Sequence, residues 1–315
     1  MAPIALVTGA TSGIGRLTVD DLVRQRADLC ILASGPDADQ SSSSPVNEFI
    51  AADLSSLSQV RQLAATVLAK DRPIALLVLA AGRQHRHDGA RSSDGFELTF
   101  AVNTIANVVL LDALIAADRM PERVLWFSSG THDPAKRAGL PTPRHADPKL
   151  LAYPERDKAA LSDKPSTRGA RAYSGSKLAA TMLTYAYARS YPGMRIDAFD
   201  PQLTPGTGLA RYQSGVIQLL WHTLLPAIVP LVPFMNRPAA VADAAVAVSL
   251  DKVLPPGSGR YIEVRRGRAR GSVVGVELRQ DRSGPIAGRH SLARGSLTVR
   301  HMRLVLRTTL LSPLP

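Results

Sequence analysis

A glycine-rich turn between a strand pattern and a helix pattern constrains this chain more than any other feature. Residues 3–8, PIALVT, form a short apolar run rich in strand-forming side chains, and residues 9–15 read GATSGIG. Residues 16–27, RLTVDDLVRQRA, then follow with amphipathic helical spacing. Glycines here let the main chain approach a pyrophosphate, while amides at the helix N-terminus face the anion. A purely structural turn is the alternative, but the position after the first strand favours a dinucleotide site.

The same alternation of strands and helices continues along the chain. Apolar runs predict further strands at 28–34, 47–54, 74–82, 123–129, 194–200 and 259–264. Helical spacing predicts helices at 55–70, 94–117 and 172–191. Apolar strands that alternate with helices specify a parallel sheet that is covered on both faces. We therefore predict an α/β fold, a Rossmann-type doubly wound parallel sheet with helices on both faces, forming a single domain over residues 1–264.

Two segments depart from this alternation. Residues 130–171 are polar and rich in proline, and we expect a long excursion over the edge of the sheet. Residues 205–240 contain about 21 largely apolar residues, a length that a membrane-spanning helix also requires. Three prolines interrupt that run, so we favour a broken helical lid over an apolar pocket. A spanning helix, peripheral membrane contact and a partner surface remain the alternatives.

The charge of the chain is concentrated at its C-terminal end. The net charge is +12, but residues 265–315 hold eleven arginines, no lysine and two acidic residues, and so carry nine of those charges. This segment could be an arm that binds nucleic acid or acidic membranes, a disordered tail, or the product of a shifted reading frame. It lacks stacking aromatic residues, which argues against the first alternative. We expect a tail that is disordered or out of frame, and no nucleic-acid partner.

Cysteine content and the N-terminus bear on the compartment. Cys30 is the single cysteine, so no internal disulfide can form. No basic region or long apolar stretch precedes the first strand, which argues against a secretory signal. We expect a cytoplasmic protein, and membrane contact stays an alternative.

Tyr173 and Lys177 stand four residues apart in RAYSGSK, residues 171–177. On a helix these side chains share one face. They could belong to a solvated surface or form a proton-transfer pair. A free tyrosine has a pKa near 10, and an adjacent ammonium would lower it toward neutrality.

Further motifs occur in an order that resembles the short-chain dehydrogenase/reductase family. The glycine turn reads TGxxxGxG, the third strand ends in Asp53-Leu54, and a mid-helix asparagine stands at Asn103. A strand ends in two serines, of which Ser129 is the second, and YxxxK follows at residues 173–177. The resemblance covers residues 3–264 and is strongest to the retinol-dehydrogenase and protochlorophyllide-reductase branch.

The resemblance implies a role for each motif. Tyr173 would be the acid/base, Lys177 would also bind the nicotinamide ribose, and Ser129 would hold the substrate oxygen. Asn103 would keep a helix irregularity open for a water. Asp53 and Leu54 would contact adenine, and Asp53 could cap a helix instead or as well. The catalytic set is Asn103, Ser129, Tyr173 and Lys177. The predicted cofactor contacts are Thr8, Gly9, Thr11, Ser12, Gly13, Ile14, Gly15, Ser34, Asp53, Leu54, Ala81, Gly82, Asn103, Tyr173, Lys177, Pro201, Leu203 and Thr204.

Two positions depart from the family pattern. Ala80 replaces an asparagine that would tie the central strands together, and Gln202 replaces a glycine close to the nicotinamide pocket. We expect Gln202 to narrow the site or to add a carboxamide contact.

The cofactor is predicted from the end of the second strand. Residues 33–36 read ASGP, so neither an acidic group for the ribose of NAD nor a basic group for the phosphate of NADP is present there. Asp37 comes slightly late, Ser12 is not basic, and Arg16 is expected to face solvent. We favour NADP over NAD, mainly because of the branch that the chain resembles.

The favoured function is hydride transfer between a nicotinamide and a carbonyl or alcohol carbon of a fairly apolar small molecule. The first alternative is a dinucleotide-binding regulatory protein with little or no turnover. The second is a C=C reductase like protochlorophyllide reductase, which would need another proton donor; Cys30 falls in the second strand, away from the expected site. The family also implies a homodimer or homotetramer. We predict no metal site.

Overall fold

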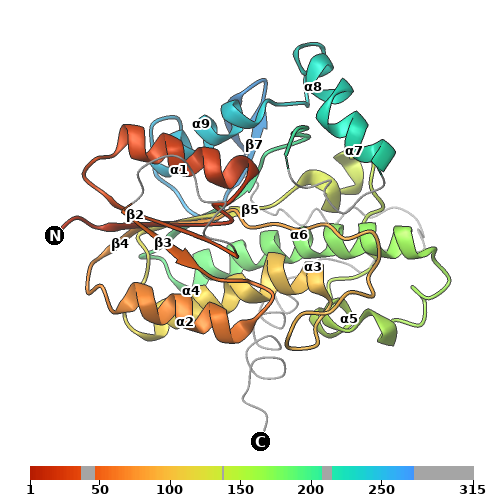
Figure 1. Ribbon diagram of the computed structural model, residues 1–315, viewed down its shortest axis with the longest axis horizontal. Coiled ribbons are helices and arrows are strands. Elements are labelled where there is room, and N and C mark those ends of the chain that lie inside the picture. Colours follow the sequence, from red (N-terminus) through yellow and green to blue (C-terminus); the bar gives the residue numbers. More distant parts are fainter. Residues whose placement is uncertain (37–46, 137, 208–214, 273–315) are drawn as a thin grey trace, which may run out of the picture.

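A single sheet with the strand order β3-β2-β1-β4-β5-β6-β7-β8 organises the molecule (Figure 1). The computed structural model describes residues 1–36, 47–136, 138–207 and 215–272 of the chain. The strands are β1 (Ile4–Thr8), β2 (Cys30–Gly35), β3 (Glu48–Ala51), β4 (Ile74–Leu79), β5 (Arg123–Phe127), β6 (Arg195–Asp200), β7 (Tyr261–Arg265) and β8 (Arg268–Ser272). The first seven are parallel, and β8 runs antiparallel to β7. The predicted doubly wound α/β fold is confirmed.

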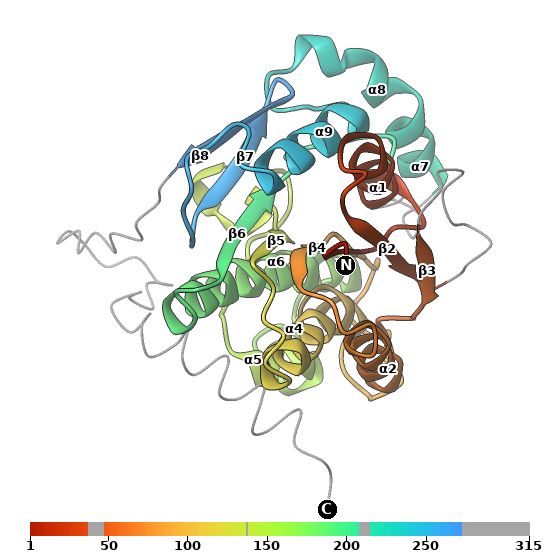
Figure 2. The ribbon, with the colours of Figure 1, turned by 90° about the vertical axis from the view of Figure 1, so that its left-hand side faces the viewer.

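Helices cover both faces of the sheet (Figure 2). The helices α1 (Gly13–Gln25) and α9 (Pro238–Ser249) lie on one face, and α2 (Leu57–Leu68), α4 (Ala106–Ala116) and α6 (Pro165–Ser190) lie on the other. Each face has its own buried apolar cluster. All residues of β1, β2 and β5 are buried, which explains why their sequences are continuous runs rather than alternating patterns.

The strand order reverses between β1 and β4. The first strand pairs with β2 on one side and with β4 on the other, so the chain winds outward in both directions from this point. Loops at the carboxyl ends of β1 and β4 therefore diverge and leave a crevice, which is where open α/β sheets bind ligands.

The long helix predicted at 94–117 is divided into three parts. The short α3 (Leu98–Phe100) leads into a π-helix (Ala101–Ile105), and α4 continues to Ala116. The whole stretch Leu98–Ala116 is apolar and long enough to cross a membrane, but 89% of it is buried inside the fold. Among the described residues it is the one helix of that kind, and its burial identifies it as a core helix.

The two irregular segments consist mainly of short helices. Residues 130–171 contain three-ten turns at Gly130–His132, Pro134–Lys136 and Pro154–Arg156, α5 (Pro148–Ala152) and the first turns of α6. The predicted lid contains α7 (Gly215–His222), α8 (Leu224–Ile228) and a three-ten turn (Val229–Leu231), while residues 208–214 lie outside the described part. The prolines thus break the apolar run as expected.

The sheet extends beyond the predicted boundary at residue 264. Strand β7 ends at Arg265, and β8 returns along it through Arg266 and Gly267, whose φ angles are 50° and 70°. Two positive φ angles in a two-residue turn are typical of a tight hairpin. Residues 265–272, assigned to the tail from sequence, therefore belong to the sheet; the rest of the predicted tail lies outside the described residues.

Candidate active site

A cavity of about 1060 Å³ lies at the carboxyl ends of the parallel strands. It runs from the glycine turn, past the loops that follow β4, β5 and β6, to the lid. Most predicted cofactor contacts line it: Gly9, Thr11, Ser12, Gly13, Ile14, Gly15, Asp53, Leu54, Ala81, Gly82, Tyr173, Lys177, Pro201, Leu203 and Thr204. The fold thus brings together residues from five separate segments.

The glycines of the turn are required by close approaches of the main chain. A Cβ on Gly15 would lie 2.3 Å from the carbonyl oxygen of Gly9, and a Cβ on Gly9 would lie 2.6 Å from the Cα of Ala81. The first turn of α1 therefore packs directly onto the loop and lines the cavity. No acidic residue occupies that first turn, so nothing there opposes an anion at the N-terminus of α1.

Asp53 and Leu54, which follow β3, also line the cavity. The Asp53 carboxylate accepts a hydrogen bond from the amide of Ser55 at 2.8 Å, while the cap position of α2 is occupied by Ser56. The amide of Leu57 is bonded instead by Asp94, at 2.9 Å. Asp53 thus forms a local turn before the helix and does not occupy its cap position.

Three predicted site residues do not line the cavity: Thr8, Ser34 and Asn103. The hydroxyl of Thr8 bridges the carbonyl of Val78 and the amide of Ala81, each at 3.5 Å, and so links β1 to β4 beside Ala80. The hydroxyl of Ser34 is buried and has no hydrogen-bond partner among the described residues. Gly35 and Pro36 line the cavity at the end of β2 instead. Arg16 is exposed, as expected, and Asp37 lies outside the described residues.

Asn103 holds the helices together behind the site. It lies in the π-helix, where its amide group donates to the carbonyl of Arg83 and to the Ser176 hydroxyl, and its oxygen accepts from the Arg83 amide. The predicted helix irregularity is therefore present. The main-chain carbonyl of Asn103, however, accepts a hydrogen bond from the Asn107 side chain at 2.9 Å.

Tyr173, Lys177 and Ser129 meet at the cavity wall. Tyr173 and Lys177 project from one face of α6, and Ser129 follows β5. The Tyr173 hydroxyl shares a hydrogen bond with Ser129. Lys177 Nζ donates to the Phe127 carbonyl at 2.9 Å and lies 5.6 Å from the centre of the Tyr173 ring. Both α6 side chains are more than nine-tenths buried, so they do not form a solvated surface.

The pKa of Tyr173 is raised and not lowered, because burial outweighs the effect that we expected from Lys177. Burial raises the pKa of Tyr173 well above its ordinary value, the hydrogen bond with Ser129 opposes that rise, and the Asp200 carboxylate adds to it. Burial lowers the pKa of Lys177 to about 8, against an opposing effect of Asp200. Sequence spacing shows that the two side chains are close, but it does not show that both are desolvated.

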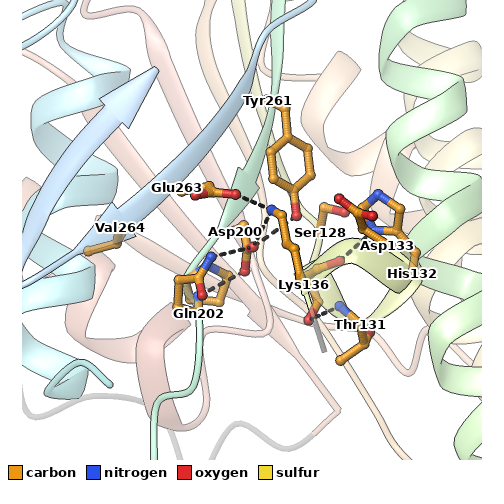
Figure 3. Close-up of polar contacts among 12 residues, drawn as sticks. Ser128, Thr131, His132, Asp133, Lys136, Asp200, Gln202, Tyr261, Glu263 and Val264 are labelled. Atoms are coloured by element: carbon orange, nitrogen blue, oxygen red, sulfur yellow. Dashed lines mark hydrogen bonds and ion pairs between the residues drawn. The ribbon is translucent and has the colours of Figure 1, made fainter. Parts of the chain in front are cut away.

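A polar cluster at the ends of β6 and β7 was missed from sequence (Figure 3). The fully buried Asp200 carboxylate accepts hydrogen bonds from the Gln202 amide at 2.8 Å, the Gln202 side chain at 2.9 Å and the Tyr261 hydroxyl at 2.9 Å. Lys136 reaches Asp200 at 3.5 Å and also binds Glu263. An acidic residue at the carboxyl end of a predicted strand was the signal that could have indicated this cluster.

Gln202 adopts a backbone conformation and a side-chain contact that the sequence did not indicate. Its φ is 58°, the left-handed conformation that favours glycine, and its carboxamide turns toward Asp200. It lines the cavity, so the predicted proximity to the pocket is correct.

The end of the cavity under the lid is largely apolar. Leu140, Trp221, Pro233 and Phe234 contribute to its wall, and the Trp221 indole donates to the Thr207 carbonyl at 3.0 Å. This arrangement supports the predicted lid over an apolar pocket.

Comparisons with curated proteins point to one family. The short chain dehydrogenase family model matches residues 3–129. Retinol dehydrogenase 12 of Mus musculus is 25% identical over 268 residues, covering 82% of this chain and 76% of that protein. Dehydrogenase/reductase SDR family member 13 of Bos taurus is 28% identical, covering 82% of this chain and 64% of that protein. Polyprenol dehydrogenase of Mus musculus is 34% identical over 180 residues, about half of each chain.

Solved structures share the fold. An uncharacterized protein of Mycobacterium paratuberculosis superposes with a TM-score of 0.62 at 20% identity, covering 96% of this chain and 92% of that chain. A blue fluorescent protein from a metagenomic library, in complex with NADPH, gives a TM-score of 0.58 at 20% identity, covering 84% and 97%. At these identities the likeness establishes the architecture alone.

Proposed function

We propose that this chain is a member of the short-chain dehydrogenase/reductase family, an oxidoreductase that acts on an alcohol or carbonyl group, and that Tyr173 is its acid/base. The proposed reaction is hydride transfer between NADP and a carbonyl or alcohol carbon of a fairly apolar small molecule. The observation that carries this proposal is the buried Tyr173 hydroxyl, bonded to Ser129 in the wall of a cavity that begins at the glycine turn.

The residues present fit a nicotinamide dinucleotide. Without a Cβ on Gly15, α1 packs against the main chain of Gly9, and the N-terminus of α1, which lines the cavity, could hold the pyrophosphate. A Cβ on Gly82 would have Lys177 Nζ, at 3.8 Å, as its nearest neighbour, so this part of the cavity is also open. Asp53 would contact adenine and Lys177 the ribose hydroxyls. When bound, the cofactor would supply the hydride.

The protein's own residues would donate and accept the proton. Because burial raises the pKa of Tyr173, its phenol is protonated at neutral pH and can donate to a carbonyl oxygen. Ser129 would orient that oxygen beside the phenol. In the direction of alcohol oxidation the phenol would have to lose its proton, and a protonated Lys177 would favour the phenolate electrostatically.

The preference for NADP is supported by the end of β2. Gly35 and Pro36 line the cavity there, and neither carries a carboxylate that would repel a 2′-phosphate. We expect tighter binding of NADPH than of NADH, which a thermal-shift titration of the purified protein with both cofactors would measure. Tighter binding of NADH would reverse this assignment.

The apolar nature of the substrate is supported by the lid. The cavity wall there includes Trp221, Pro233 and Phe234. Two of the relatives above bear the names of retinol and polyprenol dehydrogenases, and both of these alcohols carry long hydrocarbon chains. An alcohol or carbonyl group on a hydrocarbon body would place its oxygen at Ser129 and its chain under the lid.

The test is turnover across a substrate panel. NADPH oxidation is measured with aldehydes and ketones of increasing chain length, and NADP⁺ reduction with the matching alcohols. We expect kcat/KM to rise with chain length. Tight NADPH binding without turnover of any substrate would contradict the proposal and favour the regulatory alternative.

The C=C reductase alternative gains no support from Cys30. This residue begins β2, whereas the cavity lies at the opposite end of that strand. The homodimer or homotetramer and the cytoplasmic location stay predictions from the sequence; light scattering of the purified protein tests the first.

A further inference from the structure

Asp200 is a buried carboxylate that faces the candidate active site. Its exposed fraction is 0%, yet it lines the cavity together with Tyr173 and Lys177. Its hydrogen-bond partners all donate to it: the amide and the side chain of Gln202, the Tyr261 hydroxyl and the Lys136 ammonium (Figure 3). Such a set of donors uses the carboxylate as an acceptor only.

Lys136 neutralises only part of this charge. Its Nζ lies 3.5 Å from Asp200 and also forms an ion pair with Glu263, so two carboxylates share one ammonium. Glu263 has a second cation in Arg265, at 3.0 Å. A Cβ on residue 130 would lie 2.7 Å from the Lys136 side chain and 3.1 Å from the Asp200 carboxylate, so Gly130 leaves the space in which these two groups approach each other.

The charge of Asp200 matters because this residue lines the same cavity as Tyr173 and Lys177. It lies at the carboxyl end of β6, immediately before Pro201, and Leu203 and Thr204 line the cavity next to it. Its carboxylate also acts on the charge states of Tyr173 and Lys177. On the proposed function, the nicotinamide ring would bind in the cavity that these residues line. That ring is cationic when oxidised and neutral when reduced, and a nearby carboxylate in a desolvated site distinguishes the two forms.

We propose that the Asp200 carboxylate biases the site toward the oxidised, cationic form of the nicotinamide cofactor, and that Lys136 limits this bias by neutralising part of its charge. The inference rests on the proposed function, since it requires the nicotinamide to occupy this cavity. Asp200 acts here as a specificity-determining residue for the redox state of the cofactor.

The experiment compares the affinities of both cofactor forms in four proteins. The dissociation constant of the reduced dinucleotide is measured by its fluorescence, and that of the oxidised form by displacement. NADP or NAD is used, whichever the wild-type protein binds more tightly. The variants are Asp200→Asn and Lys136→Met, and Glu263→Gln is the matched control because Glu263 belongs to the same cluster but does not line the cavity. Circular dichroism and thermal melting verify that each variant is folded.

The two test variants should act in opposite directions. Asp200→Asn should raise the ratio of the oxidised to the reduced dissociation constant on the order of tenfold, and Lys136→Met should lower it by about threefold or more. Glu263→Gln should change the ratio less than Asp200→Asn does. Ratios that stay at the wild-type value in both test variants, or that shift in the same direction, would overturn the inference. If Asp200→Asn does not fold, an unchanged or raised ratio in Lys136→Met is sufficient to overturn it.

Different results would refute the proposed function and this inference. A wild-type protein that binds neither form of either dinucleotide refutes the proposed function itself. A protein that binds both forms and shows no dependence on Asp200 and Lys136 refutes only this inference.

Discussion

The ammonium of Lys177 donates a hydrogen bond to the main-chain carbonyl of Phe127, at 2.9 Å. Phe127 ends β5, and Ser129 follows two residues later, so this bond fixes the middle of α6 against the strand that carries the serine. The Ser128 hydroxyl strengthens the junction by donating to the Lys177 carbonyl at 3.1 Å. The separation of Tyr173 and Ser129 is thus set by the packing of a helix on a strand.

Gly15→Ala should disrupt the glycine turn. The new Cβ would lie 2.3 Å from the carbonyl oxygen of Gly9, so α1 must move away from the loop. We expect a lower melting temperature and NADPH affinity weaker by roughly tenfold or more. Gly215→Ala is the control, since no atom lies within 4 Å of its added Cβ. Equal NADPH affinity in both variants would show that the turn does not form the dinucleotide site.

Dinucleotide affinity should fall as the pH rises through about 8, the value to which burial lowers the pKa of Lys177. Below this pH the ammonium is present for the ribose hydroxyls. Above it the protein without cofactor holds a neutral amine and must take up a proton when the cofactor binds. Titrations between about pH 7 and pH 9 measure the slope, which Lys177→Met should lack. The same slope in both proteins would assign the titration to another group.

Glu97 should make the protein less stable as the pH rises from about 4.5 to about 7. Burial raises the pKa of this carboxyl to about 7, against hydrogen bonds from the amides of Thr99 and Phe100. The folded protein therefore retains a proton over a range in which the unfolded chain releases it, so the free energy of unfolding declines. Urea denaturation across this range should show a steeper decline for the wild type than for Glu97→Gln. Parallel curves would contradict the assignment.

The conformation of residue 202 can be tested by two substitutions. Gln202→Gly and Gln202→Ala both remove the carboxamide that binds Asp200, but only glycine adopts a φ of 58° without strain. We expect the free energy of unfolding of the glycine variant to be about 1 kcal/mol higher than that of the alanine variant. Equal stabilities in chemical denaturation would indicate that the backbone relaxes at this position.

Sequence reasoning succeeded where one local pattern determines the structure. The continuous apolar runs of β1 and β5 are typical of strands buried on both faces, and the glycine turn follows from its place between a strand and a helix. The spacing of Tyr173 and Lys177 also placed both side chains correctly on one helix face.

Features that depend on distant segments were missed. Strand β8 has the sequence RARGS, without an apolar alternation, and it is positioned by the hairpin turn from β7. The Asp200 cluster joins the ends of β6 and β7 to the loop after β5, and no spacing in the sequence reveals that proximity. The raised pKa of Tyr173 likewise follows from burial, which becomes visible only in the folded structure.

Tyr173→Phe tests the central claim most directly. Phenylalanine keeps the ring in its buried place and removes the hydroxyl, so cofactor binding should persist while proton transfer is lost. On the best substrate of the panel, kcat should fall by about 10²- to 10⁴-fold, with the NADPH dissociation constant unchanged within about threefold. Turnover within about tenfold of the wild type would show that Tyr173 is not the acid/base of this enzyme.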